Sequence, residues 1–204
     1  MAETVESGTR LARDAAAWIP SRRLAAIVAE LLSGQGFPVD LPVGGHSDPV
    51  RIDQDRLAAM LVEAMSGGGP ERVVWVSAGS ELLVDLPATR LEILDGALVA
   101  GLRVATGQTG ETDLSLVLAV GTENRGVPVL RLSGVDSAAV LRVRWADTAA
   151  AAVAGALLRV VALVAVGTGP AEPGGRERRP ASLWAQAGTL LVSARPRYDW
   201  EGAR

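Results

Sequence analysis

Apolar side chains recur at every second position along most of the stretch from Arg72 to Val120, and this pattern constrains the fold more than any other feature. In its clearest part, Leu82, Val84 and Leu86 share one face. Successive side chains on a β-strand project to opposite faces, so a period of two predicts strands with one buried and one solvated face. The strands predicted in this way are Glu81–Leu86, Thr89–Leu94, Ala97–Val104 and Asp113–Val120.

Turn signals lie between these strands. Asp95-Gly96 separates the second and third, and an Asp-Gly pair tolerates the positive φ angles of a two-residue hairpin turn. A second hairpin is predicted at Gly107–Glu111. Strands joined by such short turns are antiparallel, whereas buried parallel strands would show continuous apolar runs. The sequence therefore predicts an antiparallel meander sheet.

A long segment rich in Ala, Val and Leu, Ala149–Val166, is predicted to be a helix that is buried on most sides, because it is apolar nearly all round. Asp147 and Thr148 are suited to cap its start. We expect the helix to pack on the apolar face of the sheet. A membrane span is disfavoured, because a central Arg159 costs about 2.5–3.5 kcal/mol and cancels the gain from the Val and Leu residues.

Two helices are predicted before the sheet. Ser21 is a good N-cap for a helix over Arg22–Leu32, which carries an apolar stripe at helical spacing. Asp53 caps the second helix, and the glycines at 67–69 end it. Its predicted buried stripe comprises Leu57, Met60, Leu61 and Ala64. Residues Thr4–Ile19 are weakly helical.

Three shorter strands are predicted outside the central stretch: Val127–Leu132, Leu141–Trp145 and the region around Leu190–Val192. Pro128 has no N–H for a ladder, so it favours an edge position or a strand start. Residues 35–49 and 167–180 are rich in glycine and proline and are predicted to be loops.

These elements together predict an α+β fold. We expect an antiparallel meander sheet of about 6–8 short strands, packed on a long Ala/Val-rich helix and accompanied by two N-terminal helices. The chain divides into an N-terminal helical segment, residues 1–66, and a sheet-plus-helix part, residues 71–204. Two short helices alone have too little core to fold, so we expect both parts to form one compact domain.

Composition excludes several kinds of chemistry. The 204 residues include no cysteine, which removes disulfides, thiolate nucleophiles and cysteine-bound zinc or iron–sulfur sites. The net charge of −3, with both signs interspersed, gives no electrostatic case for nucleic-acid binding. All 20 basic residues are arginine, so the lysine of a phosphate-binding loop is missing. The first residues are acidic and unlike a secretory signal, and we expect a cytoplasmic protein.

His46, the only histidine, lies in the predicted loop 35–49 and would serve as a base if the fold brought Ser or Asp partners near. However, the chain contains no Gly-x-Ser-x-Gly nucleophile turn. Caps, turns and solvated strand faces account for the acidic pairs Asp53/Asp55, Glu81/Asp85 and Glu92/Asp95. No catalytic, metal-binding or cofactor-binding residue is therefore predicted.

The C-terminal region is the predicted partner interface, because it gathers the residue types enriched at binding hot spots. Its candidates are Arg176, Arg178, Arg179, Trp184, Arg195, Arg197, Tyr198 and Trp200. The alternative is a solvated loop followed by a tail that folds back on its own sheet.

Three functions follow from these observations. The first is a non-enzymatic structural or assembly protein that acts through protein–protein interaction, as a homo-oligomer or within a larger complex. The second is a module that binds an apolar small molecule or lipid between sheet and helix, in a cavity of about 300 Å3 or more lined by Leu and Val. The third is a hydrolase that depends on His46 or on carboxylates.

Overall fold

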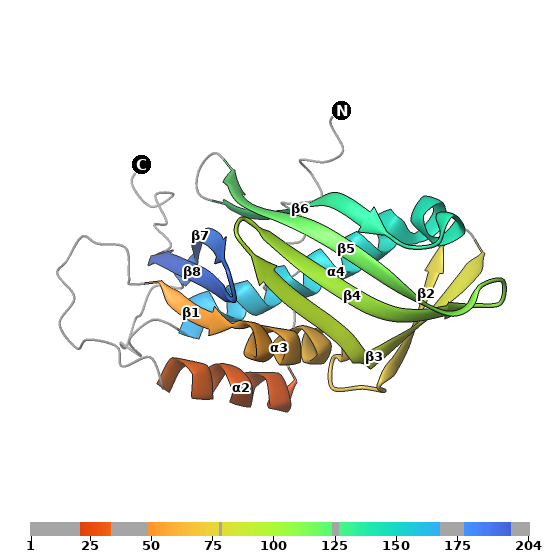
Figure 1. The fold of residues 1–204 in the computed structure, drawn as a ribbon. Helices are drawn as coiled ribbons and strands as arrows, with labels where there is room; N and C mark the ends of the chain where they lie inside the picture. Colours follow the sequence, from red (N-terminus) through yellow and green to blue (C-terminus); the bar gives the residue numbers. More distant parts are fainter. Residues whose placement is uncertain (1–20, 34–48, 78, 124–126, 168–177, 197–204) are drawn as a thin grey trace, which may run out of the picture.

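The fold is α+β, with antiparallel sheets packed on one long helix (Figure 1). The computed structural model describes residues 21–33, 49–77, 79–123, 127–167 and 178–196. The segment Thr4–Ile19 and most of the loop 35–49 lie outside these ranges. The helices are α2 (Arg22–Ser33), α3 (Gln54–Ser66) and α4 (Ala139–Gly167). The strands are β1 (Val50–Asp53), β2 (Arg72–Ser77), β3 (Ser80–Leu94), β4 (Ala97–Thr106), β5 (Gly110–Glu123), β6 (Val127–Asp136), β7 (Arg178–Gln186) and β8 (Thr189–Pro196).

Strands β2 to β6 form a curled five-stranded meander in sequence order, which confirms the predicted antiparallel sheet. The turns at Asp95-Gly96 and Gly107–Glu111 lie where they were expected, and Gly96 has a φ of +74°. The two strands predicted between residues 81 and 94 are one continuous strand, β3, whose pairing with β4 is irregular between Asp85 and Arg90. Pro128 lies in β6, an edge strand, as its missing N–H requires.

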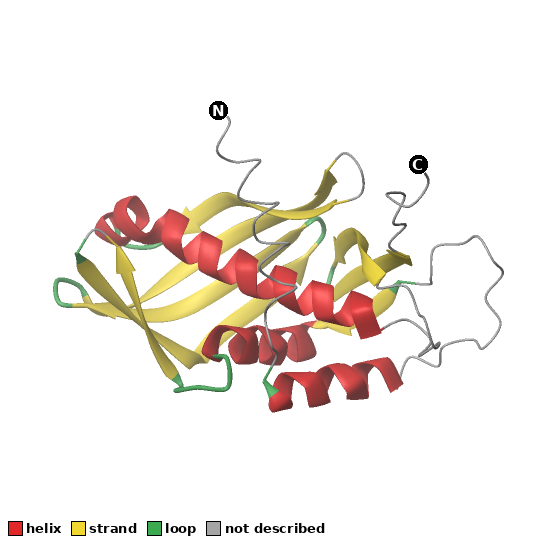
Figure 2. Cartoon of the chain, turned by 180° about the vertical axis from the view of Figure 1, so that it is seen from behind, coloured by secondary structure: helices red, strands yellow, loops and turns green. Residues whose placement is uncertain are grey.

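The inner face of this sheet is the apolar face that the alternation indicated. Its Leu and Val side chains are buried on β3, β4 and β5, and α4 crosses this face in contact with β5 and β6 (Figure 2). Over most of its length α4 is buried on several sides, through Ala149, Val153, Leu157, Val160 and Val164 among others. The Ala/Val-rich helix therefore provides the second half of the core.

Helix α4 begins ten residues earlier than the sequence suggested, and the predicted strand Leu141–Trp145 is wrong. The amides of Leu141 and Arg142 both bond to the carbonyl of Ala138, which opens the helix. Asp147 and Thr148 are interior helix positions, so neither is its cap. Five alternating residues are too few to separate a period of two from a helical period, since Leu141 and Trp145 are also four apart.

Both N-terminal caps are confirmed. The backbone N–H of Leu24 donates to Ser21 Oγ at 3.1 Å, and that of Arg56 donates to Asp53 Oδ1 at 2.9 Å. The predicted stripe of α3 is buried, and α3 ends at Gly67, whose φ is +61°. Helix α3 packs on β3 and α4, and α2 packs on α3 and α4.

The C-terminal part differs from the single strand predicted there. Strands β7 and β8 form a hairpin, and β8 also pairs with β1, which gives a second, three-stranded sheet in the order β1-β8-β7. Strand β1 was missed because it is only four residues long and pairs with a strand about 140 positions away, from Ile52 to Leu190. Ile52 is thus a buried strand residue, while Asp53 ends the strand and caps α3.

The two sheets are joined where the β7–β8 turn meets the β3–β4 turn. Gly96 N–H donates to the Ala185 carbonyl at 3.0 Å, and Gly188 N–H donates to the Ile93 carbonyl at 2.8 Å. Asp95 Oδ1 accepts a bond from the Ala187 N–H at 2.9 Å. The backbone conformation of these turns therefore fixes how the small sheet sits on the large one.

Replacing Gly188 by alanine is expected to lower the free energy of unfolding by about 1–2 kcal/mol, because its φ of +76° is unfavourable for a residue with a Cβ atom. A Cβ atom at Gly188 would meet no neighbour within 4 Å, so the cost is conformational rather than steric. Gly107→Ala is the matched control: it has equally open surroundings and no positive φ. Urea denaturation of both variants tests this difference, and equal midpoints would contradict it.

Candidate interaction surfaces

The structure describes only some of the residues of the predicted C-terminal interface. Arg176, Arg197, Tyr198 and Trp200 lie outside the described residues. Arg178 and Arg179 begin β7, Trp184 lies further along it, and Arg195 is near the end of β8. The register pairs Arg179 with Arg195, so the fold brings two members of the predicted set opposite one another along the backbone.

Trp184 is the one member of this set whose side chain is described, and it is 49% exposed. Its neighbours Leu183 and Ala185 are buried, so β7 turns those positions inward and Trp184 outward. A half-exposed tryptophan is a common anchor of protein interfaces. This position therefore remains compatible with partner docking.

A second apolar surface, which was not predicted from the sequence, lies at the β2 end of the large sheet, far from the small sheet that carries Trp184 (Figure 1). It comprises Val74 and Val76 on β2, which are 52% and 67% exposed, and Val140 and Val143 on α4, which are 42% and 86% exposed. We call these four residues the distal valine surface. The first turns of α4 lie beside β2, as Figures 1 and 2 show, and the two elements are in contact.

The sequence carried one signal of this surface. Residues 73–76 read Val-Val-Trp-Val, an uninterrupted apolar run on a strand at the edge of the sheet, whereas the similar runs Ala97–Ala100 and Leu116–Val120 lie on the inner strands β4 and β5. Val73 and Trp75 pack against the core, so Val74 and Val76 necessarily face outward. Antiparallel sheets with one solvated face usually place polar residues at such positions. Consecutive apolar residues on an edge strand therefore indicate an exposed apolar surface, because one of the two faces of that strand is solvated.

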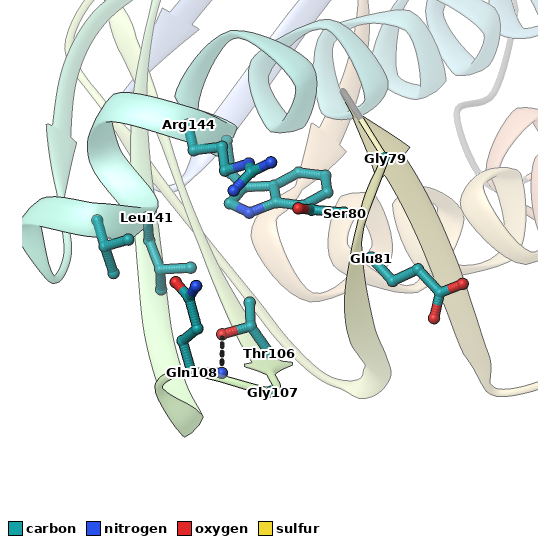
Figure 3. Close-up of a pocket in the computed structure, with 10 residues that line it drawn as sticks. Gly79, Ser80, Glu81, Thr106, Gly107, Gln108, Leu141 and Arg144 are labelled. Carbon is teal, nitrogen blue, oxygen red and sulfur yellow. Dashed lines mark hydrogen bonds between the residues drawn. The ribbon is translucent and has the colours of Figure 1, made fainter.

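A half-open cavity of about 310 Å3 adjoins the distal valine surface (Figure 3). It lies between the β2–β3 turn, the β4–β5 turn and the first turns of α4, and Val140 is part of its wall. Arg144 extends from α4 toward Ser80, while the Glu81 carboxylate points away. Thr106 Oγ1 accepts a bond from the Gln108 N–H at 3.2 Å. Glycine and polar side chains make up much of the lining, which differs from the Leu/Val-lined space expected for an apolar ligand.

One member of each acidic pair considered for catalysis has a structural role in the described part of the chain. Asp53 caps α3, Asp95 holds the β7–β8 turn, and Asp85 lies 3.8 Å from Arg72 across two strands. The described residues contain no group of three or more His, Asp or Glu placed to hold a metal ion. His46 lies outside them.

One buried and one half-buried charged group connect the helices. Glu63 on α3 accepts a bond from Ser21 Oγ at 2.6 Å and lies 3.8 Å from Arg23, both at the start of α2. Arg159 on α4 donates to the Ala64 carbonyl at 3.3 Å, and desolvation lowers the pKa of its guanidinium from the ordinary value. Both groups tie α2, α3 and α4 together rather than facing a cavity.

By length and composition α4 is also the one helix in the described ranges that is able to span a membrane, although most of its apolar window is buried inside the protein. A buried core helix passes the same test. The packing on β5, β6 and α3 is what a core helix requires.

Comparison with known proteins adds no functional information. No protein-family model, curated protein or solved structure significantly matches this chain.

Proposed function

We propose that the protein is a non-enzymatic assembly protein, which acts as a homo-oligomer or as a component of a larger complex. The observation that carries this proposal is the distal valine surface. Four β-branched apolar side chains are exposed on two elements that contact one another, β2 and the start of α4. Single exposed apolar residues are ordinary, whereas several exposed apolar residues gathered at one end of a domain favour an interaction site.

The half-exposed Trp184 supports the same proposal independently, because it lies on the small sheet at the other end of the molecule. The carboxylates with structural roles are consistent with it as well. An apolar-ligand module draws no support from the cavity, since the space beside α4 is half open and largely polar in its lining.

Native mass spectrometry of the full-length protein, first purified and then from a mild lysate, tests the proposal. We expect a mass that is a multiple of the 21.1 kDa chain, or a defined complex that contains it. Light scattering of the purified protein at several concentrations provides the second measurement. A monodisperse monomer at all concentrations, combined with no partner in the lysate, would overturn the proposal.

A further inference from the structure

The large sheet has one edge that lacks the usual protection. Edge strands in natural proteins are shielded by proline, bulges, charged residues or short length, because their free N–H and C=O groups otherwise pair with another chain. Among the described strands, β6 carries Pro128 and an irregular register, β7 carries Pro180 and an irregular register, and β1 has only four residues. Strand β2 has six residues in regular register, with Arg72 at its start as the one charge.

The register of β2 shows which of its backbone groups face the open edge. The Leu86 N–H donates to the Glu71 carbonyl at 2.9 Å, so Glu71 directs its backbone groups toward β3. Direction alternates along an antiparallel strand, and Arg72, Val74 and Val76 therefore direct theirs away from β3. Among the described strands β2 pairs with β3 alone, so these groups have no strand partner there.

The same positions carry the outward valines. Val74 and Val76 thus present apolar side chains at one edge, together with backbone groups that pair with none of the described strands. The segment Val74-Trp75-Val76 also reads identically in both directions. In an antiparallel pairing of two copies about Trp75, valine would therefore lie opposite valine and tryptophan opposite tryptophan, so like apolar side chains meet across the two-fold axis.

We propose that β2 pairs antiparallel with β2 of a second copy of this chain, around a two-fold axis opposite Trp75, and joins the two large sheets into one. Val74 would then face Val76 of the second copy in hydrogen-bonded pairs, and Trp75 would face its own counterpart in a non-hydrogen-bonded pair. This inference rests on the proposed function, since it assigns the second copy as the partner.

The side chains beside the edge supply the rest of the interface. One pair of short strands is only marginally stable in water. Cross-strand pairs of β-branched residues add to the outer face, through Val74 and Val76. Val140 and Val143 are exposed on α4, which covers the inner face and contacts β2, so they add apolar surface on the other side of the joined sheet.

The chain has no cysteine, so a pair of single-cysteine variants tests the register directly. Residues in a hydrogen-bonded antiparallel pair have Cα atoms about 5.5 Å apart, within the range of a disulfide. Under mild oxidation of the full-length protein, an equimolar mixture of Val74→Cys and Val76→Cys is expected to form a covalent dimer, while each variant alone is not. Cross-linking by Val74→Cys alone, or no cross-linking in the mixture, would overturn this pairing.

Two proline variants test the edge itself. Val74→Pro removes an N–H that faces the open edge, and Val73→Pro removes one that faces β3. We expect Val74→Pro to keep a cooperative unfolding transition and to raise the dissociation constant of the dimer at least about 100-fold, while Val73→Pro unfolds the monomer at lower temperature. Val76→Lys is the second disruptive variant if Val74→Pro does not fold.

The outcomes separate the two proposals. A protein that assembles equally well with Val74→Pro and Val76→Lys overturns the β2 pairing and leaves the assembly function in place. A protein that is monomeric without any substitution, and has no partner, overturns both.

Discussion

Replacing Trp145 by alanine is expected to lower the free energy of unfolding by about 3–5 kcal/mol, the usual cost of removing a large aromatic side chain from a core. Trp145 is fully buried and packs with the core cluster shared by the large sheet and α4. Chemical denaturation at low protein concentration measures the change, because assembly then contributes least to stability.

Val143→Ala is the matched control. The comparison also distinguishes the helix that the structure shows here from the strand Leu141–Trp145 that the sequence predicted. On a strand, Val143 and Trp145 share a face and both substitutions would be costly. On α4 the two side chains diverge, and Val143 is 86% exposed, so its replacement is expected to change stability by less than about 0.5 kcal/mol. Similar losses for both variants would contradict the helix.

Much of the fold could be predicted from the sequence because its signals are local. Asp95-Gly96 needs no distant partner to favour a turn, and Ser21 and Asp53 cap helices with bonds that span three residues. The alternation between residues 81 and 120 is long enough to exclude a helical period. These features identified the meander, its hairpins and both early helices.

The errors arose where the deciding contacts are distant. Val50–Asp53 becomes a strand only because β8 lies beside it, and the short alternation at Leu141–Trp145 was overruled by continuity with the alanine-rich helix that follows. Helix propensity and tertiary packing together outweigh a five-residue pattern. A sequence pattern of five residues contains no information on the pairing with β8 or on the packing of α4.

The candidate surfaces divide in the same way. Residue type alone pointed to Trp184, which is indeed half exposed, because tryptophan is favoured at interfaces. The distal valine surface depends instead on which strand is at the sheet edge and on where α4 begins. The strand order β2-β3-β4-β5-β6 shows that Val74 lies on an edge strand, and this position could not be predicted from the sequence alone.

The second large effect concerns the environment of α4. Ala156→Asp places a carboxylate at a fully buried helix position, and we expect a loss of about 4 kcal/mol or more, enough to prevent folding of a marginally stable domain. Ala151→Asp makes the same substitution on an exposed position of the same helix, and we expect a cost below about 1 kcal/mol, mainly from helix propensity.

Fractionation of the parent protein distinguishes a core helix from a membrane span, because the pair alone does not. In a bilayer, position 151 would lie near one end of the apolar segment Ala149–Val166 and position 156 near its centre, where an aspartate costs about 2.5–3.5 kcal/mol, so Ala156→Asp would again be the more damaging variant. Fractionation of lysates, with thermal melts of the purified variants, provides the measurement. A parent protein in the membrane fraction would refute the buried core helix. A parent protein in the soluble fraction, with a folded Ala151→Asp beside an unfolded Ala156→Asp, is the result expected of a helix with one solvated face and one face packed on protein.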